Sequence, residues 1–117
     1  MALDIEERRR KRKERAEELK RESERIVEQL RGMGAEKVVA FGSYGEGKVG
    51  MRSDLDLLVV MPDDRSGKEW GGVVWEEVER GVAVDFMVYN QGELREMLPV
   101  SSFLRHVLKE GRVLYEK

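Results

Sequence analysis

The sequence predicts an α/β (α+β) fold, in which a small mixed β-sheet is flanked by helices and a long charged helix forms the N-terminus. Three observations lead to this prediction. Residues 4–31 contain neither Gly nor Pro and are dominated by Glu, Arg and Lys. Short apolar runs rich in Val and Leu follow them, separated by turn residues or by helical patterns. The length of 117 residues suits a single domain, which we place at 1–117.

The segment 1–31 is predicted to be one long helix, because Gly32 and Gly34 follow it as stop signals. From Ala16 to Leu30, apolar residues recur at three-, four- and seven-residue intervals and form a stripe that can dock on a core. Residues 6–15 show no such stripe. We therefore expect the first half of this helix to project into solvent.

The remainder of the chain, 36–117, is expected to form the core of the domain. Its apolar runs predict strands at 37–41, 55–61, 82–89 and 112–115. The run at 82–89 reads as a buried strand with one charge inside it. Two short helices are expected at 93–98 and 101–109, with Pro99 between them. The region 73–80 fits either a helix or a strand.

Composition excludes several classes of site. The chain has no cysteine and a single histidine, so thiolate chemistry and a multi-histidine zinc site are ruled out. The formal net charge is only −2, and no apolar stretch approaches the ~20 residues of a membrane span. A cytoplasmic protein that does not act at a membrane is therefore expected.

The basic run from Arg8 to Lys13 could suggest nucleic acid. However, residues 1–31 hold 11 Lys and Arg against 9 Asp and Glu, and the remaining residues hold 11 against 15. These counts favour a solvated, ion-paired helix, and nucleic acid is not the expected partner.

Acidic residues near the second strand suggest a metal site. In an extended segment Asp54 and Asp56 would leave the same face, so their carboxylates would lie side by side. Asp85 lies within the apolar run at 82–89, where burial of its charge would require a cation or a dense set of hydrogen bonds. If the two strands are neighbours, three carboxylates converge and could bind a hard cation such as Mg²⁺. The alternative for Asp85 is a salt bridge to an arginine or exposure to water.

A glycine-rich segment, GSYGEG at 42–47, precedes these acids. Such a segment can bring backbone N–H groups close to phosphates. Residues 42–48 also fit the P-loop pattern Gly-x-x-x-x-Gly-Lys. A P-loop is disfavoured because Val49 stands where Ser or Thr should bind Mg²⁺, and because a strand is expected next rather than a helix.

The combination of GSYGEG at 42–47, SDLDLLV at 53–59 and an isolated strand aspartate at 85 resembles the minimal nucleotidyltransferases of the DNA polymerase beta-like superfamily. The resemblance extends from about Glu17 to the end of the chain. It implies the polymerase beta-like nucleotidyltransferase fold, with 36–117 as the catalytic core. It also implies Mg²⁺-dependent transfer of a nucleoside monophosphate, AMP from ATP being the expected case, to a hydroxyl on a partner protein or small molecule.

The resemblance further implies roles for individual residues. Gly42 and Ser43 would hold the phosphates of ATP or another nucleoside triphosphate. Two Mg²⁺ ions would be bound by Asp54, Asp56 and Asp85, which are the expected catalytic residues. Ser53 would belong to the nucleotide site. Related domains pair with small toxins of the HEPN class, so a toxin–antitoxin role and a HEPN-family partner are implied, and a homo-oligomer is a further expectation.

One residue departs from the family pattern. Members commonly carry Ala-Arg-Gly where this chain has Gly-Glu-Gly, so Glu46 replaces an arginine that could contact triphosphate. Lys48 or Arg52 could substitute for it. The alternative function is therefore a non-catalytic antitoxin module that binds nucleotide or protein and retains the metal site. A structural role built on the long charged helix is a third hypothesis.

Overall fold

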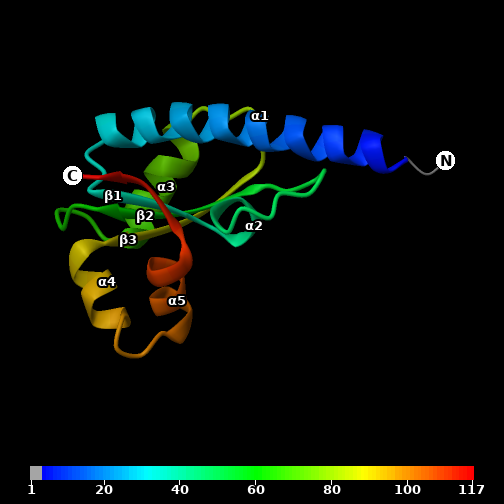
Figure 1. Ribbon diagram of the computed structural model, residues 1–117. Helices are drawn as coiled ribbons and strands as arrows, with labels where there is room; N and C mark the ends of the chain where they lie inside the picture. The colour runs from blue at the N-terminus through cyan, green and yellow to red at the C-terminus, as the bar shows by residue number, and fades with distance from the viewer. Residues whose placement is uncertain (1–3) are drawn as a thin grey trace.

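The computed structural model describes residues 4–117, so the first three residues of the helix predicted at 1–31 lie outside the described part. Within residues 4–117, helices and strands follow one another along the chain as Figure 1 shows. Their bounds are α1 Ile5–Gly32, β1 Lys37–Phe41, α2 Gly42–Gly45, β2 Leu55–Met61, α3 Gly67–Glu77, β3 Val84–Asn90, α4 Gln91–Met97, α5 Ser102–Glu110 and β4 Arg112–Glu116.

The strands form a four-stranded mixed sheet in the order β3-β2-β1-β4 within the described residues. β1 pairs antiparallel with both β2 and β4, whereas β2 and β3 run parallel. The predicted α/β class and mixed sheet are confirmed. The parallel pair requires a crossover, and α3 supplies it.

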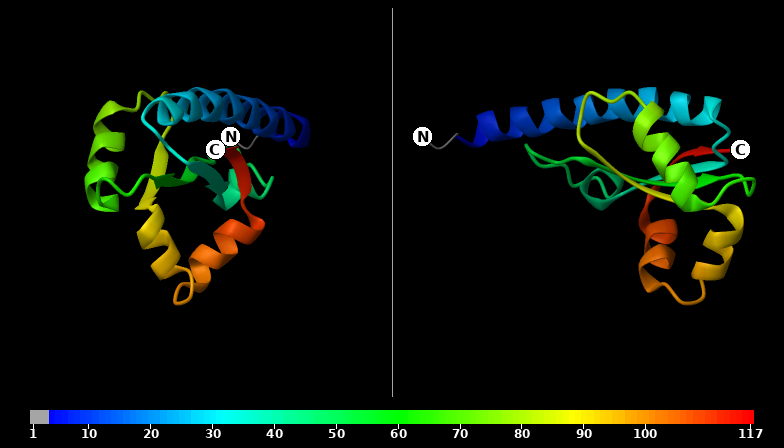
Figure 2. Two further views of the ribbon diagram at one scale, coloured as in Figure 1. Left: turned by 90° about the vertical axis from the view of Figure 1, so that its left-hand side faces the viewer. Right: turned by 180° about the vertical axis from the view of Figure 1, so that it is seen from behind.

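Helices cover both faces of the sheet. One apolar cluster joins α1 and α3 to one face, through side chains such as Leu19, Ile26 and Val74. A second cluster joins α4 and α5 to the other face, through Leu94 and Leu104. Figure 2 shows the sheet between these two layers. The alternation of side chains along each strand therefore decides which helices a given residue meets.

The predicted stripe in the second half of α1 docks on the sheet, where Leu19, Ile26 and Leu30 are fully buried. The first half of α1 extends past the end of the sheet, as Figure 1 shows. Asp4 caps the helix by accepting a hydrogen bond from the Glu7 N–H at 2.7 Å. None of the helices within 4–117 has both the length and the apolar character needed to cross a bilayer.

The region 73–80, which fitted either a helix or a strand, overlaps α3: residues 73–77 form the last part of this helix, and residues 78–80 lie beyond its end. A capping box starts this helix: the Ser66 hydroxyl accepts from the Glu69 N–H at 3.1 Å, and the Glu69 carboxylate accepts from the Ser66 N–H. The Trp70 ring N–H donates to the Pro62 carbonyl at 2.9 Å and fixes the helix against the end of β2. These contacts form the helix despite Gly71 and Gly72 within it.

The expectation that 82–89 forms a buried strand is wrong in two respects. β3 begins at Val84 and lies at the edge of the sheet, so its residues after Val84 are only partly buried or exposed. Asp85 is exposed. Because this carboxylate is exposed, it does not need a bound cation to compensate for burial. A role in metal binding must therefore be argued from the residues around it.

Candidate functional site

Two of the predicted acids lie side by side on neighbouring strands. Asp56 of β2 and Asp85 of β3 are register partners in the parallel pair. Asp56 is also opposite Phe41 of β1, whose ring packs edge-on against Phe103 of α5 with centroids 5.7 Å apart. Residues directly opposite in a sheet share a face. Both carboxylates therefore lie on the face of the sheet that α5 covers.

The pKa of Asp56 is raised above the usual range for an aspartate. Partial burial is the main cause, and the negative charges of Asp85 and Asp54 add to it. All three acids thus contribute to the electrostatic field at one point. A cation placed there would be attracted by each of them.

Asp54, however, is not aligned with the other two. It lies just before β2 begins, and its carboxylate pairs with the Arg15 guanidinium of α1 at 3.3 Å. The Arg15 Nε–H also donates to the Ser53 carbonyl at 2.7 Å. Across residues 4–117 no three acidic, His or Cys side chains are grouped closely enough to hold a metal. The expected triad is therefore only partly assembled.

The glycine segment contacts Asp56 of the acid pair directly. Gly42 has φ +66°, and a Cβ at this position would lie 2.2 Å from Asp56 Oδ2. Only glycine fits, both in conformation and in space. The expected loop is partly a one-turn helix, α2, and a Cβ on Gly45 would lie 2.2 Å from the Ala40 carbonyl. Glycines thus allow the chain to fold back tightly on β1 and to start a helical turn against the carboxylate.

The first N–H groups of a helical turn lack partners within the helix. At the start of α2 these groups belong to Gly42 and Ser43, the residues expected to hold phosphates. The arrangement combines carboxylate oxygens with backbone donors, and it fits a hard cation bound together with a phosphate group. The P-loop alternative is disfavoured further, because the residues after Lys48 form turns and then β2 rather than a helix.

A cavity of about 340 Å³ adjoins Asp56 of the acid pair. It is lined by Phe41, Gly42, Glu46, Asp56, Phe103, His106, Val107, Glu110 and Gly111. Sequence reasoning missed the contribution of α5 to this cavity, because nothing in the pattern of 101–110 shows which end of the sheet the helix covers. His106 is exposed and forms part of the wall. Glu46, another residue of the wall, adds a negative charge to the cavity.

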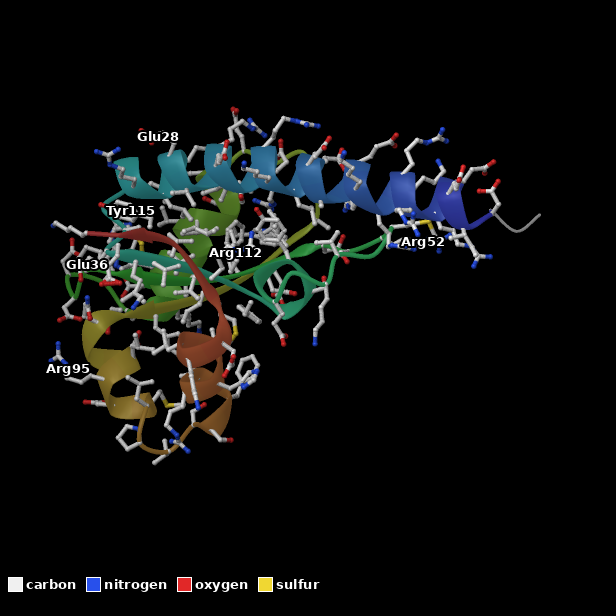
Figure 3. The ribbon with its side chains drawn as sticks, in the orientation of Figure 1. Glu28, Glu36, Arg52, Arg95, Arg112 and Tyr115 are labelled. Atoms are coloured by element: carbon white, nitrogen blue, oxygen red, sulfur yellow. The ribbon has the colours of Figure 1, made fainter. Side chains whose placement is uncertain are left out.

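The remaining nucleotide-site candidates lie apart from the acid pair. Arg52 lies at the far tip of the segment between α2 and β2, beneath the first half of α1, as Figure 3 shows. The Ser53 hydroxyl accepts from the Gly50 N–H at 2.7 Å and so holds a turn in that segment. Lys48 is exposed, and its N–H donates to the Ser43 carbonyl at 2.8 Å.

Comparisons with known proteins agree with this geometry. A crystal structure of a candidate nucleotidyltransferase from Sulfolobus solfataricus has a similar fold, with a TM-score of 0.67 and 21% identity, covering 92% of this chain and 88% of the other. No curated protein sequence matches the chain. Residues 20–115 match the family described as the nucleotidyltransferase domain. Because this match spans most of the sequence and includes both the glycine segment and the acid pair, the chain belongs to the nucleotidyltransferase domain family.

Proposed function

We propose that this chain, acting as one catalytic domain over 1–117, transfers AMP from ATP to a hydroxyl group with the help of Mg²⁺. One observation carries the proposal: Gly42, the first residue of the turn that we expect to bind phosphate, lies directly against the Asp56 carboxylate. A triphosphate on that turn would therefore lie within reach of a cation on the acid pair. The family supplies the reaction class, because nucleotidyltransferase domains generally act on nucleoside triphosphates with divalent metal.

In this proposal Asp54, Asp56 and Asp85 would hold two Mg²⁺ ions, and the bound metal would supply neutralisation of charge on the entering and leaving oxygens. Gly42 and Ser43 bind the β- and γ-phosphates through backbone N–H groups and the serine hydroxyl. Lys48, Arg52 and Ser53 belong to the same nucleotide site. Lys48 and Arg52 are exposed and lie apart from the acid pair, so each would have to turn toward the phosphates to contact them.

The chain's own acids then orient the reaction. Asp85 is exposed on the edge strand, where an acceptor could approach it, and we propose that it takes part in removing the proton of the acceptor hydroxyl. A bond forms between the acceptor oxygen and the α-phosphorus, the bond from that phosphorus to the bridging oxygen breaks, and pyrophosphate leaves. Asp54 joins the site by giving up its pairing with Arg15.

We propose an acceptor hydroxyl on a partner protein of the HEPN class, in a toxin–antitoxin pair, or on a small molecule bound between copies of this chain. The support for this step is the family resemblance, together with a cavity beside Asp56 that is large enough for an acceptor side chain.

Two observations favour the second candidate function, a non-catalytic antitoxin that retains the metal site. Glu46 lines the cavity beside Asp56 and adds repulsion against a triphosphate. In addition, Arg15 holds Asp54 away from the acid pair.

The decisive experiment incubates the protein with Mg²⁺ and α-labelled ATP, together with the product of the neighbouring gene, and follows pyrophosphate release and the mass of each protein. Asp85→Asn should abolish transfer, whereas Asp64→Asn, which removes an exposed acid from a distant turn, should not. Transfer that Asp85→Asn leaves intact contradicts the assigned role. If the wild type is inactive, Glu46→Arg separates the two candidates, because it should restore transfer only in an enzyme weakened by that single charge.

A further inference from the structure

A second cavity lies on the opposite face of the sheet, between the projecting half of α1 and the glycine segment. Its volume is about 520 Å³. Five cationic side chains line it, accompanied by one acid, Glu17, and by Ala16, Tyr44, Gly47 and Val49. The cations are Arg9, Arg12, Lys13, Lys20 and Arg112, and we call this cavity the basic cleft.

The basic cleft shows why the charge counts of α1 are misleading. Its α1 cations fall at positions 9, 12, 13 and 20, a spacing that places them on one face of a helix. Glu14 and Glu18 line a different cavity, together with Lys11, Arg15 and Arg21. The net charge of the helix sums the charges on all of its faces, whereas a ligand in the basic cleft contacts only one face.

The cations of the cleft are also free of acidic partners. None of them takes part in an ion pair within residues 4–117, where the paired cations on α1 are instead Arg10, Arg15, Arg25 and Arg31. Arg112 is held from below, with its guanidinium 4.9 Å from the centre of the Tyr44 ring. Figure 3 shows Arg112 on β4, beneath α1. Unpaired cations that converge on an open cavity favour an anionic ligand.

The spacing of these cations favours a chain of phosphates over a single one. From Arg9 to Lys20 the helix rises by about 16 Å, which exceeds the reach of one phosphate group. Three of the five cations are arginines, whose planar forks bind phosphate oxygens in pairs. We therefore propose that the basic cleft binds single-stranded nucleic acid through its phosphodiester backbone. This proposal does not depend on transfer activity, because Asp56 and Asp85 lie on the other face of the sheet.

The test measures the binding of fluorescein-labelled 12-nucleotide RNA and DNA strands by fluorescence anisotropy between 50 and 200 mM salt. Over this range the affinity should fall by about tenfold or more if several phosphates are contacted. The cleft variant is Arg9→Gln/Arg12→Gln/Lys13→Gln. The control is Arg8→Gln/Lys11→Gln/Arg21→Gln, which removes the same charge from other exposed positions of α1. The cleft variant should bind at least tenfold more weakly, and its salt slope should fall by about 2. The control should bind like the wild type.

Several outcomes overturn the proposal. Equal losses in the two variants would mean that overall charge, not the cleft, attracts the strand. No wild-type binding at 50 mM salt would also refute it. Stronger binding of a polyglutamate peptide than of either strand would assign the cleft to an acidic protein. Displacement of the strand by ATP without Mg²⁺, together with loss of ATP binding in the cleft variant, would assign it to the triphosphate. Circular dichroism melting of both variants checks that each is folded.

Discussion

Replacement of Asp56 by Asn should stabilise the protein at neutral pH in the absence of metal. The folded state holds this carboxylate partly buried, opposite Asp85 and near Asp54, and its pKa is raised as a result. Folding therefore penalises the ionised form. The penalty is absent at low pH, where Asp56 is protonated in both states. It develops as the pH rises from the unfolded pKa of about 3.9 through the raised folded pKa, and it is complete above the folded pKa.

The spacing of strands in the sheet sets the size of the repulsion between Asp56 and Asp85. Neighbouring strands lie about 4.8 Å apart, so the carboxylates of register partners are separated by about 5 Å. Two charges at that distance repel by about 0.8 kcal/mol in water and about 3 kcal/mol at an effective dielectric constant of 20. Because Asp85 is exposed, we expect a value near the lower limit, about 1 kcal/mol. For a chain of this length, that corresponds to roughly 3–6 °C in the melting temperature.

Thermal melting followed by circular dichroism provides the measurement. At pH 7 with EDTA, Asp56→Asn should melt above the wild type, while the control Asp64→Asn should not. Mg²⁺ should raise the melting temperature of the wild type and have little effect on Asp56→Asn. A variant that melts at or below the wild type at pH 7, or a gain that persists at pH 3, would refute the electrostatic account.

Three further predictions follow from individual contacts. Gly42→Ala should lower the free energy of unfolding in urea by about 2 kcal/mol or more, because the new methyl group would collide with Asp56 Oδ2 and because position 42 has a positive φ. An unchanged unfolding midpoint would contradict this close contact. Arg15→Gln should release Asp54 and tighten Mg²⁺ binding in calorimetry by up to about fivefold, whereas weaker binding would show that Arg15 supports the site. Glu22→Gln should destabilise the protein at pH 7 but not at pH 3, as melting curves at both pH values can test. The Gly81 N–H and Arg25 lower the pKa of Glu22, so the ionised carboxylate stabilises the fold and this contribution is lost when it becomes protonated.

Much of the fold could be predicted from local patterns. The strands 37–41 and 55–61 agree with β1 and β2, because their apolar runs are short and bounded by glycine or proline. Sequence reasoning left 73–80 open because Gly71 and Gly72 weaken a helix. It overlooked the capping box at Ser66 and Glu69, a signal that was available before the start of α3.

The candidate site was harder to predict, since its arrangement depends on contacts between distant segments. The residues 82–89 do not indicate whether their strand lies at the edge or in the middle of the sheet, so the exposure of Asp85 could not be predicted. Asp54 is two positions from Asp56, but it lies outside β2 and pairs with an arginine 39 residues away. The contribution of His106 to the cavity likewise depends on how α5 packs against β1.

The basic cleft and the acid pair lie on opposite faces of the sheet, and this separation has a consequence for handling the protein. An overall charge of −2 suggests a molecule that an anion exchanger retains and a cation exchanger rejects at neutral pH. However, adsorption to an ion-exchange resin depends on the charge of the surface that contacts the resin, not only on the net charge. The projecting end of α1 offers sulfonate beads a row of arginines and lysines, so we expect retention on both column types, each released by a modest salt gradient.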